Sequence, residues 1–152
     1  RVGTTRDESL RWLPIDLGDV CIALSPEGAH DRWYIDLHTG ETLLLNAEYD
    51  PQEHGGVTAR QLEGDEARFR RIPPAAAHQS VEDMAAYAES CRDETLKESL
   101  QLALQAPGPE KRFRSVLGWL PDALHGWHQF RQRKLEQRAK AFLASLGLGA
   151  TA

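Results

Sequence analysis

The sequence contains no run of about twenty consecutive apolar residues, the length that an α-helix needs to span a bilayer. It therefore predicts no membrane-spanning segment and no membrane partner. It has only two cysteines, Cys21 and Cys91, and no C-x-x-C pair. Two cysteines are too few for a disulfide framework, so they favour a reducing compartment and predict a cytoplasmic protein. The sequence begins with Arg1 and not with Met, so no targeting signal is inferred from its first residues.

The common motifs of catalysis and cofactor binding are missing as well. There is no G-x-S-x-G nucleophile turn, no H-E-x-x-H helix, no glycine loop that would cradle a phosphate, and no zinc-type spacing of Cys and His. We therefore expect no cofactor and no metal, and we favour a protein without catalytic activity. Aromatic residues make up only 7% of the chain, but 41% of its 152 residues are hydrophobic. That content is enough to bury a core, and it predicts a single domain over residues 1–152.

Residues 10–74 have the pattern of a small part with helix and strands. Apolar residues spaced for one helix face follow Asp16, which predicts a helix over residues 16–24 with Asp16 as its N-cap. Two β-rich runs, 32–37 and 41–46, flank a short turn with Gly40 and predict a β-hairpin. A third strand is expected at 67–72, where Phe69 alternates with arginines. The polar segment 48–66 has no periodicity and is interpreted as a loop.

Residues 79–147 have the pattern of helices. The segment Ser80-Val81-Glu82-Asp83 resembles a capping box and predicts the start of the first helix. Its apolar stripe consists of Val81, Met84, Ala85, Ala88 and Cys91. A second helix is predicted over 93–105, a third over 110–120, and a long last helix from Pro121 to the C′ residue Gly147. Trp119 and Trp127 are expected to pack this helical layer against the sheet.

Together these elements predict an α+β fold. A small antiparallel sheet, formed by the hairpin 32–37/41–46 with 67–72 as a candidate third strand, is expected to pack against C-terminal antiparallel α-helices. The single domain would consist of an N-terminal part over 10–74 and a helical part over 79–147.

Several short motifs occur in an order that resembles a known family. The hairpin has a Y-x-D-x-x-T-G-E pattern at residues 34–41. The later motifs, in order, are Ile72-Pro73-Pro74, Glu82-Asp83-Met84, Leu100 with Ala103-Leu104, Arg112-Phe113-Arg114 with Leu117, Trp127-His128-Gln129-Phe130-Arg131, Arg138-Ala139, Phe142-Leu143 and Gly147-Leu148. From about residue 16 to residue 148 the chain is similar to a bacterial uncharacterised protein family, UPF0158. The resemblance implies a shared architecture and supplies no catalytic residues.

One segment departs from the pattern of that family. Family members have a G-x-G-A-F-x-R-F segment where this chain has Ala106-Pro107-Gly108-Pro109-Glu110-Lys111-Arg112-Phe113. Only Arg112 and Phe113 are clearly kept. A family site that depends on this segment is therefore not expected to be intact in this chain.

The charges are distributed unevenly along the chain. The formal net charge is −5, yet residues 111–140 contain eight basic and two acidic residues, so this segment carries +6 and the remainder −11. Such asymmetry is found in surfaces that bind a polyanion, but it more often reflects a basic helix that pairs with acidic parts of its own chain, or charges of both signs that keep a surface solvated. The candidate polyanion or partner surface consists of Lys111, Arg112, Arg114, Arg131, Arg133, Lys134 and Arg138.

A metal site is one alternative on the last helix. Asp122, His125 and His128 follow one another at intervals of three residues, and imidazoles with a carboxylate can bind a divalent metal. Against this, Asp122 and His128 are six positions apart, a spacing that turns their side chains to different sides of the helix.

A small hydrolase is a further alternative. Asp36, His38 and Glu41 bracket the hairpin turn, and the next loop contains Glu48, Asp50 and His54. An acid and a base could come from these groups, although polar residues are also the usual composition of a hairpin turn. Cys21 and Cys91 fall on apolar helix faces, which favours buried and inert thiols.

These observations favour a non-enzymatic protein-interaction domain of the bacterial cytoplasm, which binds another protein or a second copy of itself. The alternative is nucleic-acid binding through the basic helices over 111–140. The third hypothesis is a small hydrolase or metal-binding enzyme. The sequence specifies neither the partner, the oligomeric state nor the role of the loop 48–66.

Overall fold

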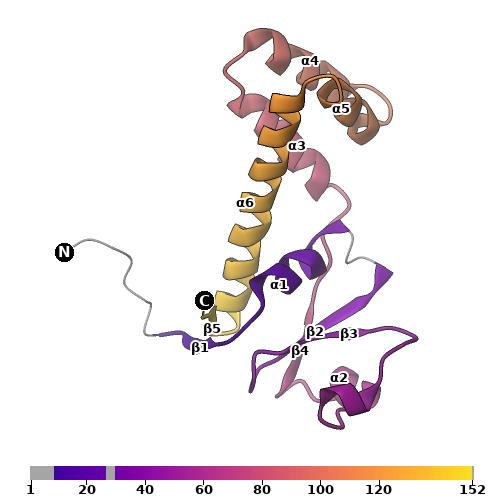
Figure 1. Cartoon of the computed structure of the whole chain (residues 1–152), viewed down its shortest axis with the longest axis vertical. Helices are drawn as coiled ribbons and strands as arrows, with labels where there is room; N and C mark the ends of the chain where they lie inside the picture. The colour runs from indigo at the N-terminus through magenta and orange to yellow at the C-terminus, as the bar shows by residue number, and fades with distance from the viewer. Residues whose placement is uncertain (1–8, 27–29, 152) are drawn as a thin grey trace, which may run out of the picture. The chain divides into compact units, whose positions relative to one another are not determined.

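The computed structural model describes residues 9–26 and 30–151 (Figure 1). The elements in chain order are β1 (Arg11–Leu13), α1 (Leu17–Leu24), β2 (Arg32–Asp36), β3 (Thr42–Leu45), η2 (Pro51–His54), α2 (Ala59–Gly64), β4 (Phe69–Ile72), α3 (Gln79–Ser90), α4 (Glu94–Gln105), α5 (Pro109–Leu117), α6 (Pro121–Ser145) and β5 (Leu148–Ala150). The predicted α+β class is therefore confirmed. Among the described helices, none combines the length and the apolar character needed to cross a membrane.

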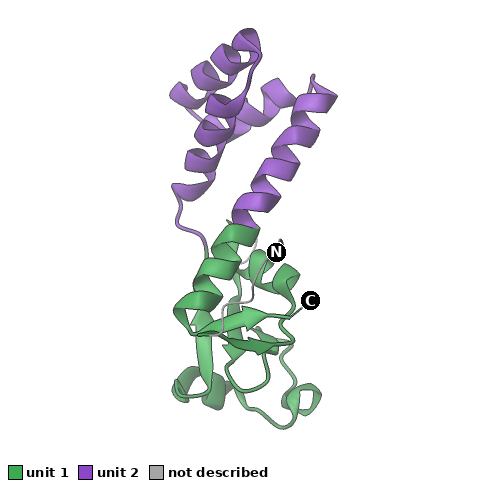
Figure 2. Cartoon of the chain, turned by 90° about the vertical axis from the view of Figure 1, so that its left-hand side faces the viewer, with its two compact units in different colours: residues 1–74, 136–152 green, residues 75–135 purple. Residues whose placement is uncertain are grey.

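The described residues form two compact units (Figure 2). The first, which we call the sheet unit, comprises residues up to 74 together with 136–151, and the second, the helical unit, comprises 75–135. Helix α6 contributes to both units, because its last turns, from residue 136, belong to the sheet unit.

The sheet unit contains a three-stranded antiparallel sheet in the order β3-β2-β4. The predicted hairpin is confirmed, with Tyr34 paired to Leu43, and the predicted third strand pairs with β2 through Tyr34 and Arg71. Gly40 closes the turn with a φ of +83°, which favours glycine. The predicted helix α1 is also confirmed, since the Asp16 side chain accepts a hydrogen bond from the backbone N of Asp19 at 3.2 Å.

The expectation that 48–66 is a loop is wrong, because this segment contains η2 and α2. Helix α2 begins with a complete capping box, in which Thr58 and Gln61 bond reciprocally through side chain and backbone. Val57 and Leu62 are buried and pack with Phe69 in the core of the sheet unit. The capping box was present in the sequence. The short helix that follows it contains only two apolar residues, which are too few to show a helical period.

A second, two-stranded sheet joins segments from near both ends of the chain and was not predicted. β1 and β5 pair in parallel, with Trp12 opposite Gly149. The Trp12 ring lies so close that a Cβ atom at Gly149 would be 2.7 Å from it, so only glycine fits there. Strands of three residues are too short to show alternation in the sequence.

The helical unit has its own aromatic core. The buried residues are Met84, Tyr87, Ala88, Leu100, Phe113, Leu117 and Trp127. The rings of Phe113 and Trp127 meet edge to face, with centroids 5.1 Å apart, and Tyr87 contacts both of them. This arrangement is the favourable one for aromatic quadrupoles. The buried position of Trp127 on α6 is thus explained by packing among helices, whereas packing against the sheet was expected.

The start of α3 and its buried face differ from the sequence-based expectation. α3 begins at Gln79 after His78, with no side-chain cap, and Ser80 lies inside the helix. Its buried residues are Asp83, Met84, Tyr87 and Ala88, whereas the predicted stripe member Ala85 is exposed. Small residues such as alanine determine the phase of a helix weakly, and the larger ring of Tyr87 sets the buried face instead.

Candidate functional site

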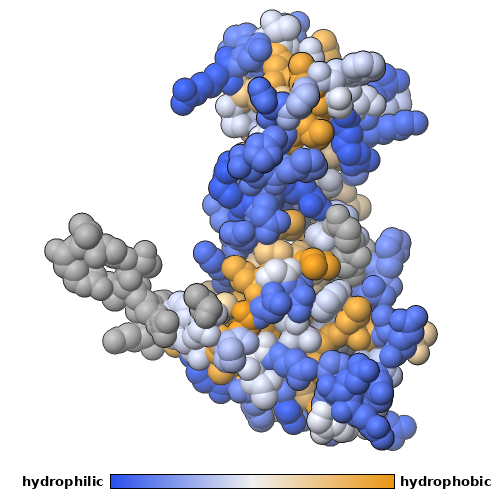
Figure 3. Space-filling view, viewed as in Figure 1, coloured by the Kyte–Doolittle hydropathy of each residue, from blue (hydrophilic) through white to orange (hydrophobic). Residues whose placement is uncertain are grey.

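The helical unit exposes large apolar side chains at the junction between α5 and α6. Trp119 has 86% of its surface exposed, although it was expected to pack inside, and Leu120 has 41% exposed. Figure 3 shows hydrophobic residues reaching the surface of this unit between polar ones. Single exposed apolar residues are ordinary, but a tryptophan exposed to this extent beside a second apolar residue is typical of a contact surface.

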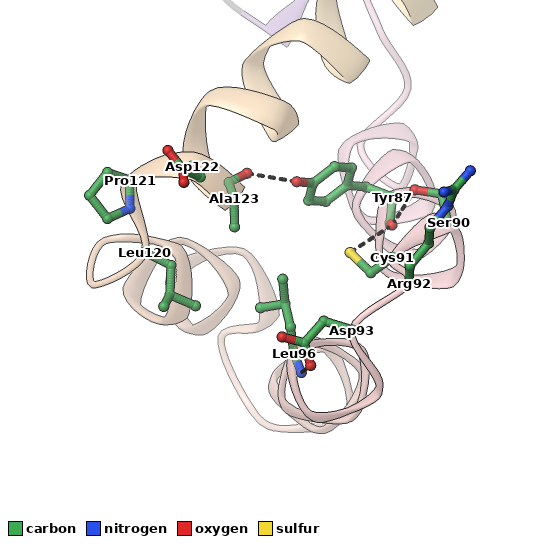
Figure 4. Close-up of a pocket in the computed structure, with 10 residues that line it drawn as sticks. All are labelled: Tyr87, Ser90, Cys91, Arg92, Asp93, Leu96, Leu120, Pro121, Asp122 and Ala123. Atoms are coloured by element: carbon green, nitrogen blue, oxygen red, sulfur yellow. Dashed lines mark hydrogen bonds between the residues drawn. The ribbon is translucent and has the colours of Figure 1, made fainter.

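An open groove of about 530 Å³ lies directly beside this junction (Figure 4). Its apolar lining comes from the end of α3, the start of α4 and the start of α6, and consists of Tyr87, Cys91, Leu96, Leu120, Pro121 and Ala123. Its polar lining consists of Ser90, Arg92, Asp93 and Asp122. Leu120 therefore belongs to the groove wall, and Trp119 is its immediate neighbour in the chain.

Local hydrogen bonds hold the walls of the groove in place. The Tyr87 hydroxyl donates to the backbone O of Ala123 at 2.7 Å, which fixes the first turn of α6 against α3. A Cβ atom at Gly126 would lie 2.7 Å from this hydroxyl, so glycine permits the close approach. The Asp93 carboxylate caps α4 by accepting from the backbone N of Thr95 at 3.0 Å and of Leu96 at 3.2 Å. The groove is thus preformed in the folded unit.

Opposite charges lie at the two ends of the groove. In Figure 4 the Arg92 and Asp122 side chains stand on opposite walls and point away from each other. Both are exposed, and within the described part of the chain neither makes an ion pair or a hydrogen bond through its side chain. Between them the Cys91 thiol donates to the backbone O of Tyr87 at 3.4 Å. Burial and the nearby Asp93 carboxylate raise the pKa of this thiol, so it stays neutral near pH 7.

A second, smaller hollow of about 380 Å³ lies between α4 and α5. Leu102, which is 59% exposed, lines it together with Ala103, Ala106 and Val116. Leu102 is an exposed apolar residue of the same unit that does not line the larger groove.

The structure places the candidate basic residues on several helix faces. On α6, Arg131, Lys134 and Arg138 are half-buried on one side, whereas Arg133 lies about 200° around the axis from Arg131 and is exposed. Lys134 lies over the Phe130 ring at 5.5 Å, and Arg131 and Arg138 each have an interaction within the molecule.

The remaining basic candidates are exposed on α5. Arg112 Nε donates to the backbone O of Pro107 at 2.9 Å, and Arg114 approaches Glu110 at 3.8 Å. Arg112 and Arg114 flank the buried Phe113 and point to opposite sides of it. Lys111 lies between them on the outer side of the helix.

The hairpin residues considered for a hydrolase are separated by the fold. Asp36 is buried, and its carboxylate accepts from Arg68 Nη2 at 2.9 Å and from the backbone N of His38 at 2.8 Å. Both interactions are structural, since they hold the hairpin turn and β4 together. The His38 side chain lines a different hollow of about 310 Å³, with Arg11 and Leu146.

A carboxylate and an imidazole do meet elsewhere in the sheet unit. His54 Nδ1 lies 2.6 Å from Glu41 Oε2, and the His54 ring stacks on Tyr49 with an interplanar angle of 4°. Tyr49 in turn donates to the backbone O of Val57 at 2.7 Å, and burial followed by the Glu41 charge raises its pKa. These contacts attach η2 to the hairpin. The backbone N of Glu48 instead donates to Asn46 Oδ1 at 2.9 Å in a local turn. The Asp50 side chain caps η2 by accepting from the backbone N of Gln52 at 3.0 Å.

The structure does not assemble a metal site on α6. Among residues 9–26 and 30–151, no three or more His, Cys, Asp or Glu side chains gather closely enough to hold a metal ion. Asp122, His125 and His128 are all exposed, and successive steps of three residues turn them progressively around the helix.

Sequence reasoning missed the groove and its two terminal charges, and it misplaced Trp119. The helix stripe of α5 contains Phe113 and Leu117, both buried. Trp119 follows Leu117 by two residues, so it falls outside that stripe, and this spacing was the available signal.

Comparison with known proteins gives a family match and a curated relative. The model of the Uncharacterised protein family (UPF0158) matches residues 17–148. A curated relative, the UPF0158 protein PA5073 of Pseudomonas aeruginosa strain PAO1, is 28% identical over 134 residues, which cover 88% of this chain and 84% of the relative. No solved structure matches the chain.

Proposed function

This chain belongs to the uncharacterised protein family UPF0158, and we propose that it is a non-enzymatic protein-interaction domain of the bacterial cytoplasm. In this proposal, the helical unit binds a partner protein at the groove beside Trp119. The observation that carries the proposal is the 86% exposed tryptophan next to a preformed, largely apolar groove. The two free cysteines suit a reducing compartment.

Tryptophan is among the residues that contribute most to protein–protein binding. A fully buried Trp side chain removes about 150–250 Å² from water, and truncation of such an anchor costs about 2 kcal/mol or more. Trp119 lies in the chain between the C-cap Gly118 and the wall residue Leu120, so in this proposal the partner that fills the groove also covers the indole. The surrounding polar groups form the hydrophilic rim that such interfaces carry.

Charge favours a protein partner over a nucleic acid. The helical unit contains eight basic and eight acidic residues, so its formal charge is zero and the whole −5 of the chain falls on the sheet unit. Nucleic-acid binding depends on clustered cations that displace counterions. The basic candidates of α5 and α6 point in several directions, and part of them already interacts within the molecule.

Site-specific photocrosslinking tests the proposal. A benzophenone amino acid at position 119 is expected to yield a discrete covalent adduct in cells of the source bacterium, identified by mass spectrometry. The same probe at the exposed Glu98 of α4, outside both hollows, serves as the matched control. Adding Leu120→Glu, which changes the groove wall at a partly exposed position, should abolish the adduct. The proposal fails when position 119 gives no adduct beyond the control, or an adduct insensitive to Leu120→Glu.

Fluorescence anisotropy with a labelled DNA duplex and a labelled RNA tests the alternative function. We expect no saturable binding at low salt. Binding that weakens steeply with salt and is reduced by Arg133→Ala would instead assign function to the basic helices.

A further inference from the structure

We propose that the partner at this groove is a second copy of this chain, and that each copy inserts Trp119 into the groove of the other around a two-fold axis. This inference rests on the proposed function and names its partner. It is drawn from the position of the indole relative to the groove, and from the charges at the two ends of the groove.

An exposed indole and a groove wall are one residue apart in the chain. Trp119 projects from the α5–α6 junction, and its neighbour Leu120 lines the groove, so the two features are one residue apart. A two-fold axis between them places the indole of each copy against the groove of the other, which makes the contact isologous and closed. The groove volume of about 530 Å³ falls within the range of about 300–1,000 Å³ for ligand pockets and can take an indole ring.

The charges of the groove are complementary to those of a second copy that faces it in the antiparallel orientation. Arg92 lies at one end, beside the Asp93 carboxylate that caps α4, and Asp122 lies at the other; Arg92 and Asp122 are each exposed and without an ion-pair partner among the described residues (Figure 4). When two grooves face each other antiparallel, Arg92 of one copy meets Asp122 of the other, and the symmetric pair forms at the opposite end. A two-fold contact always produces such pairs twice.

The overall charge of the helical unit also permits self-association. With eight basic and eight acidic residues, two helical units have no net electrostatic repulsion. Two indoles, two grooves and two ion pairs make a small interface, so we expect a weak dimer with Kd on the order of 10–100 µM.

Sedimentation velocity of the full chain, from about 1 to about 500 µM, tests the inference. The wild type should shift from monomer to dimer across this range. Trp119→Ala should raise Kd at least about 30-fold, as expected for loss of an interface anchor. Leu102→Ala removes another exposed apolar side chain of the same unit, outside the groove, and should leave Kd unchanged. Because Trp119 is exposed, its truncation should leave the fold intact, which circular dichroism checks.

Charge reversal tests the predicted pairing of the two copies. Arg92→Asp and Asp122→Arg should each weaken the homodimer at least about 10-fold, because each puts like charges together at both ends. An equimolar mixture of the two variants should recover a heterodimer, since both of its ends then contain one positive and one negative partner. Native mass spectrometry distinguishes the heterodimer from either homodimer, provided the two variants carry different isotope labels.

The inference is overturned when the wild type remains monomeric up to about 500 µM, when Trp119→Ala dimerises as the wild type does, or when mixing the two charge variants gives no heterodimer. The crosslink at position 119 separates this failure from failure of the proposed function. An adduct to a different protein would refute the self-association and retain the interaction domain, whereas absence of any adduct would refute the interaction domain itself.

Discussion

Replacing Asp36 by Asn should destabilise the protein more than any exposed ion-pair substitution. Asp36 is only 2% exposed, and its two carboxylate oxygens accept from Nε and Nη2 of Arg68 and from the backbone N of His38 and of Thr39. An amide group cannot replace this set, because it offers one acceptor oxygen and no negative charge. The guanidinium of Arg68 then loses its partner.

The size of the effect follows from burial of the carboxylate. Removing one partner of a buried ion pair costs about 3–5 kcal/mol, mainly because the other charge stays desolvated. The Arg68 side chain is 34% exposed and can recover contact with water, so about 2–3 kcal/mol is expected for Asp36→Asn. Glu63→Gln is the matched control. Its ion pair with Arg32 has a similar distance of 2.8 Å, but both side chains are about half exposed, so it should cost about 0–1 kcal/mol.

The difference in unfolding free energy between the wild type and Asp36→Asn should depend on pH, which gives a second measurement. Burial alone raises the pKa of Asp36, but hydrogen bonds from the Arg68 side chain, the His38 amide and the Thr39 side chain outweigh it and lower the pKa overall. A lowered pKa in the folded state means that the carboxylate stabilises the fold at pH values above its ordinary pKa of 3.8. This stabilisation is lost as the pH falls below that value toward the folded-state pKa.

Urea denaturation of the wild type, Asp36→Asn and Glu63→Gln, followed by circular dichroism between about pH 3 and pH 7, measures both effects. The gap in unfolding free energy between wild type and Asp36→Asn should be constant above about pH 5 and should narrow below about pH 4. A cost for Asp36→Asn no larger than that for Glu63→Gln, or a gap that stays constant down to pH 3, would refute the assigned role of the buried carboxylate.

Three further substitutions or reactions probe other parts of the fold. Gly126→Ala should destabilise by about 1–3 kcal/mol, because its Cβ would lie 2.7 Å from the Tyr87 hydroxyl, whereas Gly118→Ala should be neutral or stabilising by about 0.5 kcal/mol; thermal unfolding compares the two. Thr58→Ala should cost about 1 kcal/mol through loss of the capping box, and equal stability of this variant and the wild type in urea would contradict the capping role. Cys91 should react with a disulfide reagent at pH 8 more slowly than free cysteine, because burial raises its pKa, and stopped-flow absorbance measures the rate.

The strongest sequence signals were those with both a turn and a period. The hairpin was predicted because β-rich runs flank Gly40, and the structure pairs these runs, with Arg32 opposite Leu45 and Ile35 opposite Thr42. The family resemblance, drawn from motif order, is confirmed by the family match over residues 17–148. In both cases several independent residues agreed, so one misread position could not change the conclusion.

Elements shorter than one period were missed for a physical reason. β1 and β5 have three residues each, and their pairing depends on contact between residues 11–13 and 148–150. A parallel pair between distant segments leaves no local signature, because its hydrogen bonds connect backbones irrespective of side chains. The helix α2 did leave a local signature in Thr58 and Gln61, but six residues provide too few apolar positions for a period.

The two tryptophans near the start of α6 show which part of the site was accessible from the sequence. Trp127 lies three residues after Leu124 and three before Phe130, so it falls on an apolar stripe, and it is 4% exposed. Trp119 lies off the stripe of α5 and is 86% exposed, so spacing alone separates a core ring from a surface ring.

The groove itself was not accessible in this way, because its walls come from three helix ends that meet only through Tyr87 and the aromatic core. A Tyr87→Phe substitution removes the hydroxyl that holds Ala123 while keeping the ring. It should therefore weaken binding at the groove although Trp119, Leu120 and the charged groups of the groove are unchanged. Such an effect would show that the binding surface depends on the interior that positions it.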